Sequence, residues 1–288
     1  MNIQLSDHFN YKKLFLFTLP SVVMMVFTSV YCVVDGFFVS NFAGKTAFAA
    51  INLIMPFIMI LGGIGFMIGT GGSALVSYTL GTGDKEKANR YFSMMVYFTI
   101  LAGILLTVLG IIFVRPIAEL FGADESMMDT CVLYGRIVIA FNAAFMLQNI
   151  FQSFFVVAEK PRLGLIVTIA AGVTNMVLDA LFVGVFKWGI VGAALATGIS
   201  QSIGGLLPLL YFALPNNSPL QLTRTGFELA PLLKASSNGC SELMSNVASS
   251  LIGIMYNYQL MRLGGENAVA TYGVLMYIPA SYTHLRAH

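Results

Sequence analysis

The sequence has 288 residues, of which 57% are hydrophobic and only 10% charged, and its mean hydropathy is +0.82. Soluble domains carry about 25% charged residues, so this composition excludes an ordinary soluble protein and indicates a membrane protein that crosses the bilayer several times. A net charge of +2 is too small to suggest a nucleic-acid partner. At about 20 apolar residues per span plus connections, the chain has room for about eight helices.

Polar connections divide the chain into eight apolar runs. We expect these runs to form helices, because backbone polar groups in lipid must be paired within their own segment. The first run is too long for a signal peptide and lacks a small-residue cleavage site, so it should remain as the first span. The predicted spans are 14–40, 47–80, 91–114, 129–158, 163–186, 190–214, 231–262 and 267–280.

Basic residues in the connections predict the orientation of these spans. If the N-terminus lies inside, the inner side carries more than twice as many basic residues as the outer side. This bias predicts a multi-pass protein of the inner (cytoplasmic) membrane with a cytoplasmic N-terminus. The inner set is Lys12, Lys13, Lys85, Lys87, Arg90, Lys160, Arg162, Arg224 and Lys234, and the outer set is Lys45, Arg115, Lys187 and Arg262.

The long polar connection from Pro215 to Ala230 predicts a boundary between two bundles. Residues 1–214 would form a six-helix N-terminal bundle, 215–230 a cytoplasmic linker, and 231–288 the start of a second bundle. An internal repeat supports this division, because the segment from Gly44 to Ala50 resembles the segment from Gly265 to Thr271. Both copies lie on the same predicted side of the membrane, so the repeat would be parallel, about an axis along the membrane normal.

The last eight residues, 281–288, abandon the apolar pattern and hold two of the three histidines. We interpret this tail as a truncated or frame-broken end of the second bundle. Two histidines without a nearby acidic or sulfur ligand do not predict a metal site.

Isolated acids inside the apolar runs are the strongest functional signal. Asp35 lies within the run from Phe15 to Val39, and Asp179 and Glu242 follow in later spans. A charge at the centre of a bilayer costs roughly 2.5 kcal/mol or more, so such residues usually face a bundle interior or a water-filled path. Tyr31 lies one turn before Asp35 on the same helical face. These acids suggest ion-coupled transport.

Asn175 and Asp179 have i, i+4 spacing, so they present one polar stripe to one neighbouring helix. With Asp35 and other polar residues they could line a cavity inside the six-helix bundle. Two acids close together titrate as a pair, which makes a proton-binding device. The alternative is a structural acid that pairs with another helix, for instance with Arg136. The other polar positions are Thr197 and Gln201 on span six and Asn149, Gln152 and Ser153 on span four.

Two further residues have separate predicted roles. Pro20 lacks a backbone N–H and should kink the first span, giving it two bending states as a hinge. Glu242 belongs to the second bundle, where the repeat places it opposite Ser21. It could bind an ion or a cationic substrate there, or it could be an interfacial acid solvated from the inside.

No arrangement of residues suggests an enzyme. All three histidines lie near the termini, and no Ser/His/Asp or Cys/His set is evident. The segment Gly69-Thr70-Gly71-Gly72 lacks the Gly-Lys-Ser/Thr ending of a phosphate-binding loop, so nucleotide-driven transport has no support. We therefore expect no cofactor other than a coupling ion.

Several segments along the chain carry a family resemblance. They are Leu19-Pro20, Val34 to Val39, Gly69 to Ala74, Asn175 to Phe182, Gly192 to Thr197 and Asn238 to Glu242. Together they resemble the multidrug and toxic compound extrusion (MATE) family, and the span-seven segment resembles the bacterial branch that carries a glutamate there. The resemblance covers the chain up to about Ala280.

This resemblance implies two six-helix bundles beside a central cleft, with drug or metabolite export driven by inward proton or sodium flow. It also implies that most of the second bundle is absent from this chain. Gln152 occupies the neighbourhood where some members have an amide. By position, the family's cation site would be formed by Pro20, Tyr31, Asp35, Asn175, Asp179 and Thr197.

The leading hypothesis is an antiporter that exports small amphipathic organic cations, with Asp35 and Asp179 as the coupling carboxylates. The coupling ion would be H⁺ or Na⁺, and a sodium ion could bind at Asp35, Asp179 or Glu242. We expect membrane lipid around a full-length monomer. One alternative is a lipid-linked oligosaccharide flippase, which should need basic groups in its cleft, whereas only Arg136 lies well inside a span. The other is a non-coupled channel or a membrane scaffold.

Overall fold

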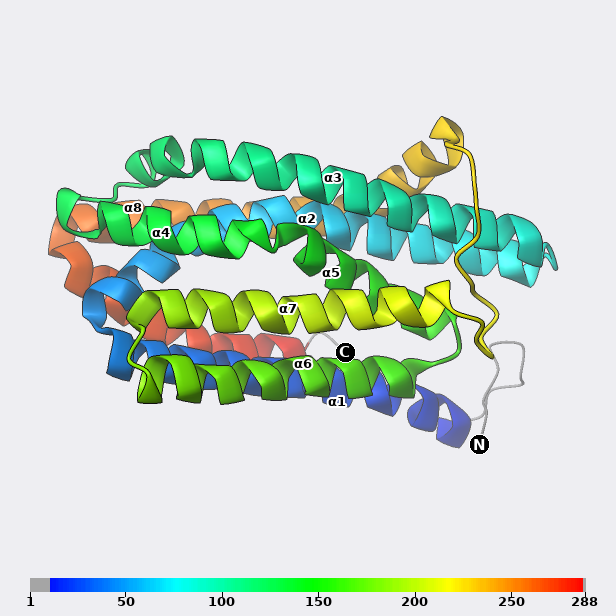
Figure 1. Cartoon of the computed structure of the whole chain (residues 1–288), viewed down its shortest axis with the longest axis horizontal. Coiled ribbons are helices and arrows are strands. Elements are labelled where there is room, and N and C mark those ends of the chain that lie inside the picture. Colours follow the sequence, from blue (N-terminus) through cyan, green and yellow to red (C-terminus); the bar gives the residue numbers. More distant parts are fainter. Residues whose placement is uncertain (1–10, 287–288) are drawn as a thin grey trace.

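The protein is a bundle of long helices that run roughly along one axis (Figure 1). The computed structural model describes residues 11–286, and all regular elements in this part of the chain are helical, which confirms the predicted all-α class. The elements are α1 (Tyr11–Phe38), η1 (Val39–Ala43), α2 (Lys45–Gly81), α3 (Lys85–Leu120), α4 (Glu125–Ala140), α5 (Asn142–Val157), α6 (Pro161–Asp179), η2 (Ala180–Val185), α7 (Gly189–Ala213) and α8 (Leu229–Arg286).

Five helices among the described residues are long and apolar enough to cross a membrane, or six if α4 and α5 count as one bent span. They coincide with the first six predicted spans. The two arms of α8, which meet at Gly265, fall at the predicted seventh and eighth spans but do not belong to this apolar set. The first arm carries Lys234, Glu242 and Arg262 and many serine and asparagine residues, so it is more polar than the helices of the first bundle.

The predicted fourth span is not one straight helix, because α4 and α5 meet at an angle of 54°. Phe141 lies at the bend, and its ring packs against Gly198 of α7, where even a methyl group would overlap it. The bend therefore lets both halves of the span pack along the same neighbouring helix.

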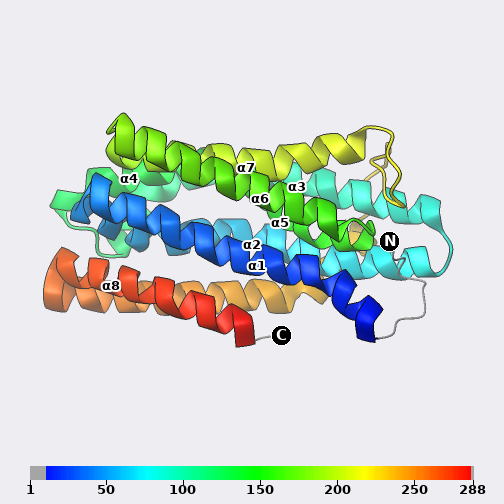
Figure 2. The same ribbon diagram turned by 90° about the horizontal axis from the view of Figure 1, so that it is seen from below.

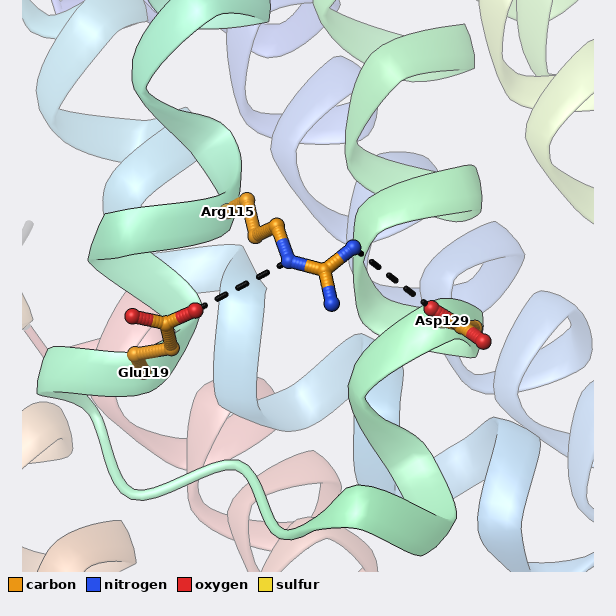
Figure 3. Close-up of polar contacts among 3 residues, drawn as sticks. All are labelled: Arg115, Glu119 and Asp129. Atoms are coloured by element: carbon orange, nitrogen blue, oxygen red, sulfur yellow. Dashed lines mark ion pairs between the residues drawn. The ribbon is translucent and has the colours of Figure 1, made fainter.

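The third helix is longer than predicted. The sequence suggested that Arg115 begins a polar connection, but α3 continues to Leu120. Arg115 is exposed near the end of the helix, and its Nε lies 3.7 Å from Glu119 and its Nη1 3.9 Å from Asp129 of α4 (Figure 3). Such exposed pairs are compatible with a helix that extends beyond the bilayer.

The connections alternate between two ends of the bundle (Figure 1). The linker end contains the start of α1, the α2–α3 and α5–α6 turns, and the irregular residues 214–228. The far end contains Gly44 and Gly265, which have φ angles of +95° and +61°. These two glycines are equivalent in the predicted repeat and both join consecutive helices, which is local agreement with that repeat. The boundaries of the two bundles stay a prediction.

The linker end is filled by an aromatic cluster. Ring centroids lie 4.8 Å apart for Phe92 and Phe154, and 5.1 Å apart for Phe92 and Phe212. Aromatic pairs at these separations stabilise a core beyond their buried area. The members of the cluster are Phe92, Phe151, Phe154, Phe155, Tyr211 and Phe212.

Helix α8 folds back on itself and packs beside α1 and α2 (Figure 2). The closest approach to α2 is at two glycines. A Cβ added to Gly71 would overlap the carbonyl oxygen of Ala235, and one added to Gly239 would overlap that of Met67. Small residues allow such close backbone contact between membrane helices.

Candidate ion-binding site

The helices that carry the two acids, α1 and α6, lie side by side (Figures 1 and 2). Gly172 of α6 brings them together, because a Cβ at this position would lie 2.5 Å from the ring of Phe27 and 2.9 Å from that of Tyr31. Tyr31 precedes Asp35 by one helical turn, and Gly172 precedes Asp179 by two. The close contact therefore lies within one to two helical turns of both acids.

Asp35 and Asp179 are near neighbours whose carboxyl groups interact with each other. Asp179 is fully buried, and Asp35 is partly buried with its Oδ1 atom inaccessible. No described donor reaches Asp35 Oδ1 or either oxygen of Asp179 at hydrogen-bonding geometry. Two carboxylates offer only acceptors, so a proton or a cation is needed to join them. The arrangement thus has the chemistry of a cation site.

Asn175 adds an acceptor to this pair from one turn earlier on α6. Its side chain is 2% exposed, and its Oδ1 has no hydrogen-bond partner. Buried polar atoms are usually paired, so an unpaired oxygen beside two unpaired carboxyl groups needs an explanation. A bound proton, cation or water would satisfy it.

The alternative that these acids pair with Arg136 is wrong in this structure. Arg136 is exposed on α4. In the part of the chain that the structure describes, no basic side chain forms an ion pair with Asp35 or Asp179. Within the described residues, the charge of the two acids is therefore not neutralised by a basic side chain.

Each acid is followed by a π-helical segment. Segment η1 begins four residues after Asp35, and η2 begins directly after Asp179. Both segments are the C-terminal ends of their helices, directly before Gly44 and before the α6–α7 connection. The sequence predicted plain helices here, and it contains no proline or glycine pattern common to both segments that would have revealed them.

Two other predicted residues lie on neighbouring helices. Thr197 of α7 is partly buried, and its carbonyl oxygen accepts a hydrogen bond of 2.8 Å from Ser200. Gln152 of α5 lines a small cavity of about 10 Å³ together with Gln148 and Thr168. This volume is close to that needed for one water molecule.

Gln148 was not among the sequence-based candidates. Its Oε1 atom is buried without a partner, as is that of Gln201 on α7. The signal that could have found it is its position four residues before Gln152, on the same face of α5. The described part of helices α1 to α7 therefore contains buried polar atoms without partners besides those of the acid pair.

Pro20 and Glu242 lie elsewhere. Pro20 is buried within α1 at the linker end, where it lines a different cavity. Glu242 is partly buried on α8 and is not among the groups that interact with Asp35 or Asp179. Among the described residues, no cluster of three or more His, Cys, Asp and Glu could hold a metal ion. His288 of the predicted polar tail lies outside the described residues.

Comparisons with known proteins agree with this architecture. The MatE family profile matches residues 20–181. The multidrug export protein MepA of Staphylococcus saprophyticus is 24% identical over 92% of this chain, and that of Staphylococcus aureus strain MRSA252 is 25% identical over 92%. The chain spans 58% of the length of each of these relatives.

Solved structures show the same fold. An inward-facing multidrug resistance MATE family transporter superposes with a TM-score of 0.80 over 89% of this chain and 60% of that one, at 20% identity. A MOP superfamily transporter from Pyrococcus furiosus gives 0.82 over 95% and 62%, at 21% identity. The family profile covers more than half of the sequence. The chain therefore belongs to the MATE family, whose members are membrane transporters and not enzymes.

Proposed function

We propose that the full-length protein exports small amphipathic organic cations or drugs across the cytoplasmic membrane in exchange for H⁺ or Na⁺. The observation that carries this proposal is the pair Asp35 and Asp179, buried without a donor or a basic partner among the described residues. The relatives named as multidrug export proteins support the class of substrate.

In this mechanism, the coupling ion binds between the two carboxyl groups and supplies the missing link between α1 and α6. An ion can shift the protein between cleft states only if it binds those states with different affinity. The π-helical segments end both helices shortly after the acids, so the ion would bind near the far ends of α1 and α6. Asn175 would provide a further oxygen ligand, more useful to Na⁺ than to H⁺.

The proposed orientation places the linker end in the cytoplasm. The inner set of basic residues predicted from the sequence belongs to connections at this end, and Lys45, Lys187 and Arg262 belong to the far end (Figure 1). Cytoplasmic loops of membrane proteins carry the excess of lysine and arginine.

A flippase for lipid-linked oligosaccharides is less well supported. Its anionic substrate should need basic side chains in the interior. The one basic residue placed well inside a predicted span, Arg136, is exposed on α4 and does not face the acid pair. The unpaired acids favour a cationic substrate or coupling ion instead.

Ethidium efflux tests the proposal. Cells expressing the gene completed through its second bundle would be assayed before and after the proton gradient is collapsed at fixed sodium. Loss of efflux would indicate proton-dependent export and make Asp35→Asn and Asp179→Asn the next variants. Efflux that persists but requires a sodium gradient would indicate Na⁺ coupling and make Glu242→Gln the next variant. Gene-dependent flux that runs only downhill and ignores both gradients would contradict antiport.

A further inference from the structure

A large cavity at the linker end has no part in the proposed ion site. Its volume is about 690 Å³, and it lies between the start of α1, the α5–α6 turn and the end of α7. Pockets for small molecules typically measure 300–1,000 Å³, so this space can hold a headgroup-sized ligand. The lining residues that carry the argument below are Leu16, Glu159, Lys160, Arg162, Ile166 and Leu214.

The polar part of the cavity favours an anion. Lys160 and Arg162 both line it, and neither forms an ion pair within the described part of the chain. Glu159 is the one acid in the lining, so the charged lining residues sum to one positive charge. Helix α6 begins at Pro161 between the two basic residues, and no side chain caps its N-terminus. Pro161 has no N–H, and the N–H groups of Leu163 and Gly164 already donate to the carbonyl oxygen of Lys160, so this end of α6 adds mainly the attraction of the helix dipole for a negative group.

Apart from Tyr211, Asn216 and Asn217, the rest of the lining is apolar, and several of these apolar side chains are exposed. Ile166 and Leu214 are each 62% exposed, and Leu16 is 36% exposed. These side chains belong to three different helical segments, α6, the end of α7 and α1. They form an apolar border directly beside the two cations. A ligand that fits both parts must combine an anionic head with apolar chains.

We propose that this cavity binds an anionic phospholipid from the leaflet at the linker end. The phosphate would lie at Lys160, Arg162 and the N-terminus of α6, and the acyl chains would lie along Leu16, Ile166 and Leu214. Basic pockets between membrane helices on the cytoplasmic side bind anionic headgroups in this way. The assignment to the cytoplasmic leaflet rests on the proposed orientation, whereas the binding itself does not depend on transport. The bound lipid would contact α1 and α6, the two helices that carry Asp35 and Asp179.

Native mass spectrometry of the detergent-solubilised chain tests this site. The probes are phosphatidylglycerol, zwitterionic phosphatidylcholine of the same acyl composition, and inorganic phosphate. The test variant is Lys160→Gln with Arg162→Gln. The matched control is Lys85→Gln with Lys87→Gln, which removes the same charge from exposed positions at the same end of the bundle. Circular dichroism and gel filtration would verify that both variants keep the helical fold.

The expected result is preferential binding of phosphatidylglycerol that the test variant weakens about thirtyfold and the control variant weakens less than threefold. Excess inorganic phosphate should not displace the lipid, because it lacks the apolar chains. Equal weakening in the two variants would overturn the proposal, since any surface charge would then suffice. Binding of phosphatidylcholine with equal affinity would overturn the role of the two cations. Full displacement by inorganic phosphate would replace the lipid site with a simple anion site.

Discussion

The acid site and the aromatic cluster lie in the same bundle, but they differ in whether their buried groups have partners. At the linker end, Phe92 and Phe212 are fully buried and every ring has ring partners. Around Asp35 and Asp179, equally buried atoms lack partners. Packed aromatic rings stabilise one another and need no ligand. Two buried carboxyl groups without donors need a proton or a cation between them. The difference separates a part of the bundle whose buried groups all have partners from a part whose buried polar atoms do not.

The largest expected effect comes from neutralising the acids. Asp35→Asn and Asp179→Asn should each reduce ethidium efflux by the completed protein to the level of cells without the gene, because an amide cannot exchange a proton or neutralise a cation. Immunoblots of isolated membranes should show normal insertion. Asp129→Asn, whose side chain is 93% exposed, is the control and should export normally. Normal efflux in both acid variants would remove the proposed site.

Truncation of the aromatic cluster should affect stability rather than coupling. Phe212→Ala removes a fully buried ring, and such changes cost about 3–5 kcal/mol in the free energy of unfolding. Thermal unfolding in detergent would measure the loss. Phe113→Ala, at a position 51% exposed, should lie near the wild type. If Phe212→Ala instead altered the ion dependence of efflux at equal protein level, the aromatic cluster would also contribute to coupling, contrary to this prediction.

The glycine contact between α2 and α8 should tolerate no methyl group. Gly71→Ala would overlap the backbone at Ala235, and overpacking of this kind typically costs about 1–3 kcal/mol. The same unfolding measurement applies, with Gly81→Ala as the control, because no atom lies within 4 Å of a Cβ at that position. Equal melting temperatures for the two variants would show that this contact is not tightly packed in the membrane.

The smallest expected effect is at the exposed ion pairs of Arg115. Its side chain is 58% exposed, and pairs of this kind contribute about 0–1 kcal/mol. Arg115→Gln should therefore leave the melting temperature almost unchanged. A large decrease in melting temperature would mean that the ion pairs of Arg115 stabilise the end of α3 more than exposed pairs usually do.

Much of this arrangement could be predicted from the sequence. Hydropathy defined the spans, because the bilayer sets their length, and the i, i+4 spacing of Asn175 and Asp179 predicted their common stripe. The bend at Phe141, the extension of α3 past Arg115 and both π-helical segments could not be predicted. The bend depends on the contact of Phe141 with Gly198 of another helix, which no local pattern encodes. The functions of Glu242 and Thr197 stay predictions.

The linker between α7 and α8 is attached along the start of α3. The backbone N–H of Gln221 donates to Asn89 Oδ1 at 3.0 Å, and that of Thr223 donates to Ser93 Oγ at 2.8 Å. The N–H of Leu222 donates to the carbonyl of Phe212 at 2.8 Å. The first residue of α8, Leu229, lies only six positions after Thr223. A chain of that length reaches at most about 20 Å when fully extended. The start of α8 is therefore held close to the start of α3, and any movement of α8 relative to α3 is limited to that distance at this end.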